Sequence, residues 1–247
     1  MSRSGPPVLA SGPRWPDVQR GIPVPTLLDL SHVIEPDMPR FRSFDAPHVG
    51  ALWTHADAAA RGYYQGTTCE VTEVRFVTSI GTYLDAPYHF DPGGADISRL
   101  DLSQLVLPGQ VLDLRRQAAP DAPLPADALV DGLEVAGKAL LLYTGWSDRW
   151  GDEAYYHGPF VSRTMAERLR TMRPALVGID TLIIDSAQDP TRPAHTLLLR
   201  AGLLIVENLT GLGQLAGESF TFVAAPVKVQ GAAAFPVRAF AMLAADK

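Results

Sequence analysis

Polar side chains recur at alternate positions within the segment from Ser79 to His89. In an extended chain alternate residues share one face, so Ser79, Tyr83 and Asp85 are expected to point the same way, with His89 following them. Such a row is typical either of the solvated edge of a sheet or of the wall of a functional site. In a site, the carboxylate, phenol and imidazole could act as acid and base. The segment alone leaves both interpretations open.

A single carboxylate, Glu207, interrupts an apolar run that is otherwise typical of a buried strand. Burying an ionised carboxylate is costly unless the group is paired or bound to a metal ion. His195 lies twelve residues upstream, at the start of a predicted short helix. Together, Asp85, His195 and Glu207 form an oxygen-rich set with one imidazole, which suits Zn²⁺ or Mn²⁺. The alternative is an ion pair between Glu207 and Arg200 or Arg238, which the composition leaves open.

The chain as a whole has the composition of an ordinary globular protein. It has 247 residues, of which 47% are hydrophobic and 19% charged, and its formal net charge is −6. This length fits one large domain, and without a run of lysine and arginine no nucleic-acid partner is expected. The single cysteine, Cys69, excludes an internal disulfide and a cysteine-based zinc site. Because neither a signal-peptide core nor a run of about 18 apolar residues is found, we expect a cytoplasmic protein that does not contact membranes.

The elements that must position these residues alternate irregularly between strands and helices. Apolar periodicity predicts strands at residues 26–33, 70–77, 79–89, 109–114, 138–143, 175–179, 203–209, 220–229 and 235–243. It predicts helices at 162–172, with a capping box formed by Thr164 and Glu167, and at 195–201, ended by Gly202. We therefore expect an α/β single domain at 26–247, with a mixed or barrel-like sheet and flanking helices, preceded by an arm at 1–25.

Two motifs that resemble functional signatures are not predicted to be functional sites, and one loop is predicted to lie at the surface. Residues 211–216 match G-x-G-x-x-A, but no acidic residue follows about 20 positions later, so a turn is predicted rather than a dinucleotide site. Ser147 lacks the second glycine of a nucleophile elbow, so a serine hydrolase is not expected. The aromatic loop at 146–156 is predicted to be exposed and available for contacts between subunits.

The segment from Ser79 to His89 resembles the signature of the putative cyclase family, which includes bacterial kynurenine formamidases and isatin hydrolases. That signature is H-x-G-T-H-x-D-x-P-x-H, and it is matched at the required spacing by Gly81, Thr82, Asp85, Pro87 and His89. His195 and Glu207 resemble the family's later metal-binding histidine and glutamate, in the same helix–glycine–strand context. The resemblance implies a swivelling β/β/α fold from about residue 26 onward, and a homodimer or homotetramer.

The sequence departs from the signature at two histidine positions, which are occupied by Ser79 and Tyr83. In the family these histidines and the aspartate hold one metal ion, while the aspartate, the later histidine and the glutamate hold another. Serine is a poor ligand at neutral pH, and tyrosine would have to ionise from an ordinary pKa of about 10. The resemblance therefore implies one remaining divalent ion, zinc or manganese, at Asp85, His195 and Glu207.

The resemblance also implies a metal-dependent hydrolase of an amide, formamide or cyclic amide bond. Its leading small-molecule substrates would be aryl formamides such as N-formylkynurenine, an intermediate of tryptophan catabolism. The metal ion would lower the pKa of water and polarise the carbonyl, His89 would donate and accept protons, and Tyr83 would hydrogen-bond the developing oxyanion. Phe41, which stands in place of a family tryptophan, and Ser79 would contact the substrate. Two alternatives remain: a metal-free cyclase, dehydratase or isomerase that uses His89, Asp85 and Tyr83, and a non-catalytic binder of small molecules.

Overall fold

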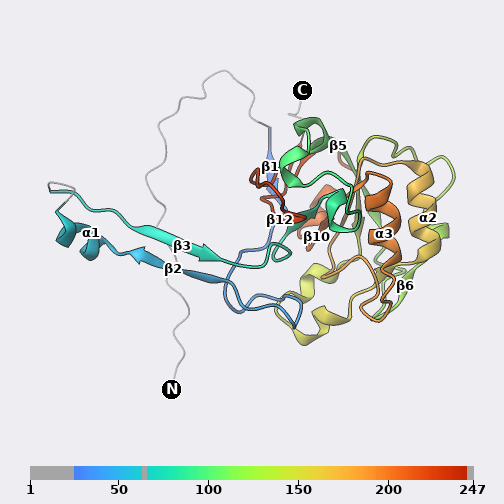
Figure 1. Ribbon diagram of the computed structural model, residues 1–247. Helices are drawn as coiled ribbons and strands as arrows, with labels where there is room; N and C mark the ends of the chain where they lie inside the picture. The colour runs from blue at the N-terminus through green and yellow to red at the C-terminus, as the bar shows by residue number, and fades with distance from the viewer. Residues whose placement is uncertain (1–24, 63–65, 244–247) are drawn as a thin grey trace.

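The computed structural model describes residues 25–62 and 66–243 and is built around a curled, nine-stranded mixed sheet (Figure 1). Across the sheet the strands follow the order β1 (Leu27–Asp29), β13 (Phe240–Leu243), β11 (Phe220–Val223), β5 (Val106–Asp113), β7 (Ala139–Tyr143), β9 (Leu176–Ile179), β10 (Leu204–Glu207), β4 (Tyr83–Asp85) and β12 (Ala234–Pro236). Neighbouring strands from β5 to β10 are parallel, and all other neighbours are antiparallel. The predicted single α/β domain with a mixed, half-barrel sheet is confirmed. The predicted arm at 1–25 lies outside the described residues except for residue 25.

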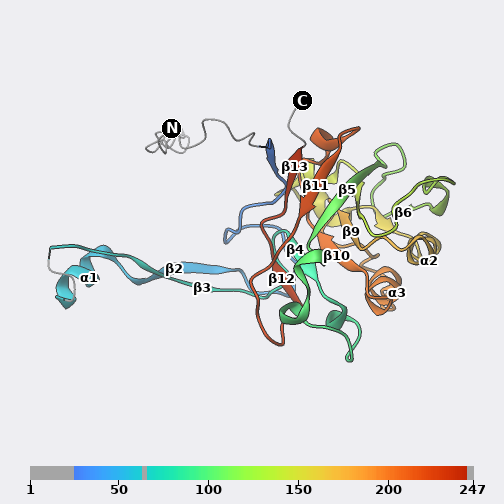
Figure 2. The same ribbon diagram turned by 90° about the horizontal axis from the view of Figure 1, so that it is seen from above.

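Two short two-stranded sheets and three α-helices complete the described structure. They are β2 (His48–Trp53) with β3 (Val71–Arg75), β6 (Pro123–Leu124) with β8 (Phe160–Val161), and the helices α1 (His55–Arg61), α2 (Arg163–Met172) and α3 (Pro193–Arg200). The β2–β3 ribbon, with α1 at its far end, extends away from the rest of the molecule (Figures 1 and 2). Among the described residues no helix is long and apolar enough to cross a membrane.

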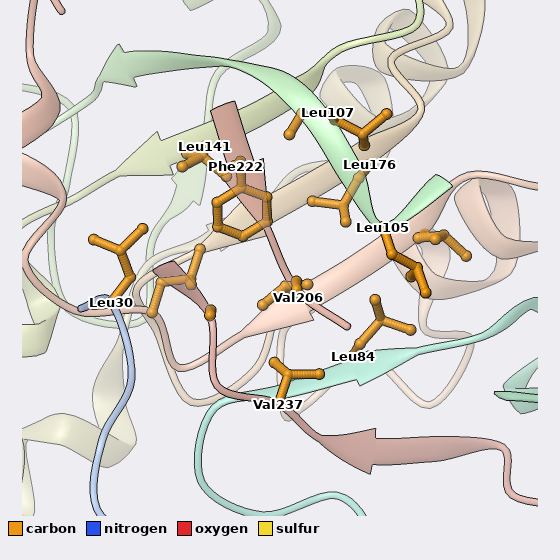
Figure 3. Close-up of a cluster of buried hydrophobic side chains, with 14 of the residues drawn as sticks. Leu30, Leu84, Leu105, Leu107, Leu141, Leu176, Val206, Phe222 and Val237 are labelled. Carbon is orange, nitrogen blue, oxygen red and sulfur yellow. The ribbon is translucent and has the colours of Figure 1, made fainter. Parts of the chain in front are cut away.

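The two faces of the sheet carry separate hydrophobic clusters, because successive side chains along a strand point to opposite faces. Leu141 of β7 belongs to the cluster inside the curl of the sheet, together with Leu84 of β4 and Val206 of β10 (Figure 3). Leu140 faces the opposite way, into the cluster that α2 and α3 cover. Since Leu84 and Val206 point into the curl, the residues on either side of them point toward the helices.

Helix α2 begins at a different cap from the one predicted. The hydroxyl of Ser162 accepts a hydrogen bond from the backbone N–H of Met165 at 3.1 Å, so Ser162 is the N-cap residue. The predicted capping box at Thr164 and Glu167 is wrong, because both residues lie inside the helix. The helix ends where Arg173 adopts a left-handed conformation, with φ of 56°.

The aromatic loop at 146–156 is exposed only in part: residues 148–149 and 151–153 are exposed, as the sequence predicted, but two of its aromatic residues are not. It forms two short 3₁₀ turns, and the side chains of Trp146 and Tyr155 are buried, with exposed fractions of 4% and 0%. A 3₁₀ turn at Leu212–Leu215 occupies the G-x-G-x-x-A segment, as the predicted turn requires. The predicted strand at 79–89 is shorter than expected, because β4 ends at Asp85 and Pro87–His89 form another 3₁₀ turn.

Candidate active site

Antiparallel pairing of β4 with β10 gathers the acidic residues of the site. Tyr83 lies directly opposite Glu207, and Asp85 lies opposite Ile205. All four side chains share the face that is turned toward α3, which carries His195. One potential ligand atom from each of Asp85, His195 and Glu207 lies within 4.8 Å of the others, and all three residues are buried.

A polar network joins the beginning of β4 to the end of β10. The Thr82 hydroxyl donates to the carbonyl of Asn208 at 2.6 Å, and the Asn208 side-chain amide donates to the carbonyl of Gly81 at 2.7 Å. Tyr155 donates to the remaining side-chain oxygen of Asn208 at 2.8 Å. Gly81 has φ of +62°, and a Cβ atom there would approach Ile34 to 3.1 Å. The glycine therefore suits both the left-handed backbone and the tight packing that fix this end of the site.

Asp185 holds the imidazole of His195 in a defined orientation. Its carboxylate accepts the backbone N–H groups of Ala194 and His195 in the first turn of α3, at 2.7 and 3.0 Å. The same carboxylate lies 2.7 Å from Nδ1 of His195. Nδ1 then donates a hydrogen bond to Asp185, and Nε2 faces Glu207 Oε1 at 3.4 Å and Asp85 Oδ2 at 3.7 Å.

The two buried carboxylates that face His195 differ in their hydrogen bonds. Glu207 accepts the backbone N–H of Ile184 on Oε1 at 2.6 Å, and it accepts the hydroxyl of Tyr83 on Oε2. By contrast, neither carboxylate oxygen of Asp85 has a hydrogen-bond partner in the part of the chain that the structure describes. Buried polar atoms without partners are rare and costly, and a bound cation would satisfy this pair. The donor set of two carboxylates and one imidazole fits a divalent metal ion.

Neither arginine that the sequence offered as a partner for Glu207 reaches it. Arg238 instead forms an ion pair with Asp29, and Nε of Arg200 donates to the carbonyl oxygen of Phe90 at 3.3 Å. The ion-pair interpretation of Glu207 is therefore wrong. The basic group that faces Glu207 is instead His195, whose Nε2 lies 3.4 Å from Glu207 Oε1.

The pKa shifts describe a site with an excess of negative charge. Burial alone would lower the pKa of His195, but the carboxylates of Glu207, Asp185 and Asp85 raise it to about 10. Burial raises the pKa of Glu207, and the nearby charge of Asp85 adds to this effect. Burial and the charges of Glu207 and Asp85 raise the pKa of Tyr83 well above its ordinary value, so Tyr83 remains a neutral phenol.

A cavity of about 150 Å³ lies beside these residues. It is lined by Phe41, Phe44, Ser79, Tyr83, His89, Phe90, Ile183, Arg192, His195 and Glu207. Nε2 of His89 lies 3.7 Å from Asp85 Oδ1, and the His89 side chain is 31% exposed. Phe90 stacks on the ring of His195, with the ring centroids 4.8 Å apart. The cavity thus places aromatic walls, an accessible imidazole and the buried carboxylate of Glu207 around one small space.

Comparison with known proteins identifies relatives of this chain. The family described as putative cyclase matches residues 28–186. The chain belongs to the putative cyclase family. It is 30% identical to a kynurenine formamidase of Delftia acidovorans, over 70% of this chain and 80% of that protein. It is 29% identical to an isatin hydrolase of Roseibium aggregatum, over 66% of this chain and 71% of that protein. A solved structure described as a predicted metal-dependent hydrolase from Bacillus stearothermophilus has a TM-score of 0.71 and 27% identity, and the match covers 87% of this chain and 97% of that one.

In this member of the putative cyclase family, the two residues that replace signature histidines lie in the cavity wall. The hydroxyl of Tyr83 donates its single hydrogen bond to the carboxylate of Glu207, so that donor is not directed at the cavity. Ser79 is half-buried.

Sequence reasoning missed several residues that shape the site. The only signal for Asp185 was indirect: a buried histidine such as His195 needs an acceptor for its second ring nitrogen, and Asp185 is that acceptor. Phe90 follows His89 directly and could have been considered with it. Phe44 and Arg192 gave no sequence signal, because the chain brings them to the cavity from loops distant from the signature segment.

Proposed function

We propose that this protein is a hydrolase that cleaves the carbon–nitrogen bond of an aryl formamide, with one zinc or manganese ion held by Asp85, His195 and Glu207. Relatives named kynurenine formamidase and isatin hydrolase support hydrolysis of a carbon–nitrogen bond outside peptides. A solved neighbour named metal-dependent hydrolase supports the use of a metal ion.

One observation carries this proposal: the buried carboxylate of Asp85 has no hydrogen-bond partner among the described residues, although it faces two imidazoles. Glu207 and His195 present further donor atoms to the same point. A divalent ion bound there would polarise a carbonyl group and lower the pKa of water. Two of the three proposed ligands are already held by hydrogen bonds, since Asp185 orients His195 and Tyr83 donates to Glu207.

In the proposed reaction the oxygen of water bonds to the formyl carbon, the carbon–nitrogen bond breaks, and formate and an arylamine are released. His89 takes a proton from the water and gives it to the leaving nitrogen. Burial lowers the pKa of His89 despite the opposing charge of Asp85, so its imidazole is neutral at neutral pH and able to accept that proton. Phe41, Phe44 and Phe90 pack against the aryl ring and limit the access of water.

The test is formate release from N-formylkynurenine by protein dialysed against zinc or manganese, with ring opening of isatin measured in parallel. His89→Ala is expected to lower kcat by about 10²–10⁴-fold without changing the metal content, because a proton-transfer group is lost. His157→Ala is the matched control, since His157 is exposed and neither it nor its partner Asp121 lines the cavity. Full activity in metal-free protein would favour the metal-free enzyme, and binding of aryl compounds without any turnover would favour the binder; either result contradicts the proposal.

A further inference from the structure

The cavity contains a cationic side chain that the proposed reaction does not use. Among the residues that line it, Arg192 alone carries a fixed positive charge. Its neighbours there are aromatic rings and the carboxylate of Glu207, whose negative charge would disfavour an anionic substrate. A guanidinium group in such a wall changes which ligands the cavity accepts.

The backbone holds Arg192 at the cavity by a conformation that is uncommon for a side chain of this kind. Arg192 has φ of +44° and immediately precedes Pro193, the first residue of α3. Its carbonyl accepts the N–H of Thr196 at 2.9 Å, which fixes it to the first turn of the helix that carries His195. Non-glycine residues in the left-handed region are strained, and such strain is often retained where it positions a functional group.

One carboxylate lies near the charge of Arg192: the pKa of Asp189 is lowered first by hydrogen bonds from Thr191 and then by the charges of Arg163 and Arg192. Nη1 donates to the carbonyl oxygen of Ser186, which is uncharged. No ion pair within the described ranges includes Arg192. Asp189, the nearby acidic residue of the same loop, accepts the N–H and hydroxyl of Thr191 at 2.8 and 2.7 Å. The guanidinium therefore retains donors and charge for a ligand.

We propose that Arg192 binds a carboxylate of the substrate, so that the preferred substrates are aryl formamides that also carry an anionic group. This inference rests on the proposed function and specifies its substrate class. A guanidinium can bind a carboxylate through two parallel hydrogen bonds, which an ammonium group cannot reproduce. The cavity volume of about 150 Å³ is below the range of roughly 300–1,000 Å³ that is usual for drug-sized ligands, and it suits a single aromatic ring.

Two substrates that differ only in the carboxylate test this assignment: 2-formamidobenzoate and formanilide. With the metal-loaded protein, Arg192→Gln is expected to lower kcat/KM for 2-formamidobenzoate by about 10- to 100-fold, mainly through KM, and to leave formanilide nearly unchanged. Arg192→Lys should lie between the two, because it keeps the charge but loses the paired hydrogen bonds. Arg170→Gln, on the exposed surface of α2, is the matched control.

Equal losses on both substrates would show a merely structural role for Arg192 and overturn the inference, as would an unchanged preference for the anionic substrate. If wild-type protein hydrolyses neither of these substrates nor N-formylkynurenine, the proposed function fails, and binding still decides the role of Arg192. In calorimetric titrations, 2-aminobenzoate should then bind more tightly than aniline to the wild type, and Arg192→Gln should remove that difference. Retention of the difference in Arg192→Gln would overturn the inference independently of catalysis.

Discussion

Hydrogen bonds fix several side chains of the site, most evidently those of Tyr83 and Glu207. The hydroxyl of Tyr83 donates to Glu207 Oε2, while the backbone N–H of Ile184 occupies Oε1. The side chain of Tyr83 is only 4% exposed, so water cannot easily replace its hydroxyl. A hydrogen bond of this kind both stabilises the buried carboxylate and sets the direction of its remaining lone pairs.

Replacing Tyr83 by phenylalanine tests this support, because the ring is kept and only the hydroxyl is removed. The affinity for zinc or manganese, measured by calorimetry, should fall by about 10- to 100-fold. The free energy of unfolding, measured in urea, should fall by about 1–3 kcal/mol because a buried charged acceptor loses its donor. Tyr88→Phe, at a residue that is 42% exposed, should change neither quantity. An unchanged metal affinity in Tyr83→Phe would show that Tyr83 does not act through a metal ligand.

Another buried carboxylate, that of Asp180, makes the stability of the fold depend on pH. Its oxygens accept hydrogen bonds from Thr144 and Gly145, yet burial raises its pKa from 3.8 to about 6. Between these two values the folded protein binds more protons than the unfolded chain. The stabilising contribution of Asp180 is therefore present below pH 4 and is lost as the pH rises to about 6.

Urea unfolding of the wild type and Asp180→Asn at a series of pH values checks this dependence. Relative to the variant, the wild type should gain about 3 kcal/mol in free energy of unfolding between pH 7 and pH 4, which corresponds to a pKa shift of about two units. Most of the gain should appear between pH 6 and pH 4. A difference between the two proteins that does not vary with pH would contradict the raised pKa of Asp180.

Among the elements, those that are buried on both faces were the most predictable from sequence. The apolar runs of β7 and β10 and the breaker Gly202 after α3 identified three elements that the structure contains. The ribbon strand β2 and helix α1 were not identified, because most of their residues are exposed and apolar periodicity reports burial. The antiparallel pairing that brings β4, with Asp85, beside β10, with Glu207, could not be derived from local patterns, because these carry no information on contacts between distant segments.

The start of α2 shows how sequence and structure can differ by a single turn. Ser162 and Thr164 are both capable of capping a helix, and packing of Met165 into the core favours the start at Ser162. Ser162→Ala should therefore lower the free energy of unfolding by about 1 kcal/mol, whereas Thr164→Ala should change it by less. Urea denaturation of the two variants provides the comparison. A larger effect at Thr164 would restore the capping box that the sequence predicted.

At the scale of the whole molecule, the β2–β3 ribbon is the part of the described structure that extends away from the rest (Figure 2). It exposes three large apolar side chains, Val49, Leu52 and Val74, with exposed fractions of 49%, 57% and 47%. An isolated two-stranded ribbon is marginally stable in water. We therefore expect a second copy of this chain to cover the ribbon, in a homodimer or a homotetramer.

Light scattering during gel filtration should accordingly give a mass that is two or four times the 26.6 kDa of one chain. Val49→Asp combined with Leu52→Asp should shift the protein toward the monomer, because charged groups would enter the contact. Val227→Asp is a control, since Val227 is exposed outside the ribbon. A monomeric wild type, or an oligomer that the paired substitution leaves intact, would contradict this role of the ribbon.

The central claim is that Asp85, His195 and Glu207 together hold one divalent ion, and elemental analysis tests it most directly. Wild-type protein is dialysed against zinc or manganese, freed of unbound ion and analysed for metal per chain, beside Asp85→Asn. We predict one ion per wild-type chain and substantially less in the variant, because the buried carboxylate of Asp85 has no hydrogen-bond partner among the described residues. Two ions per chain, none, or an undiminished content in Asp85→Asn would contradict the claim.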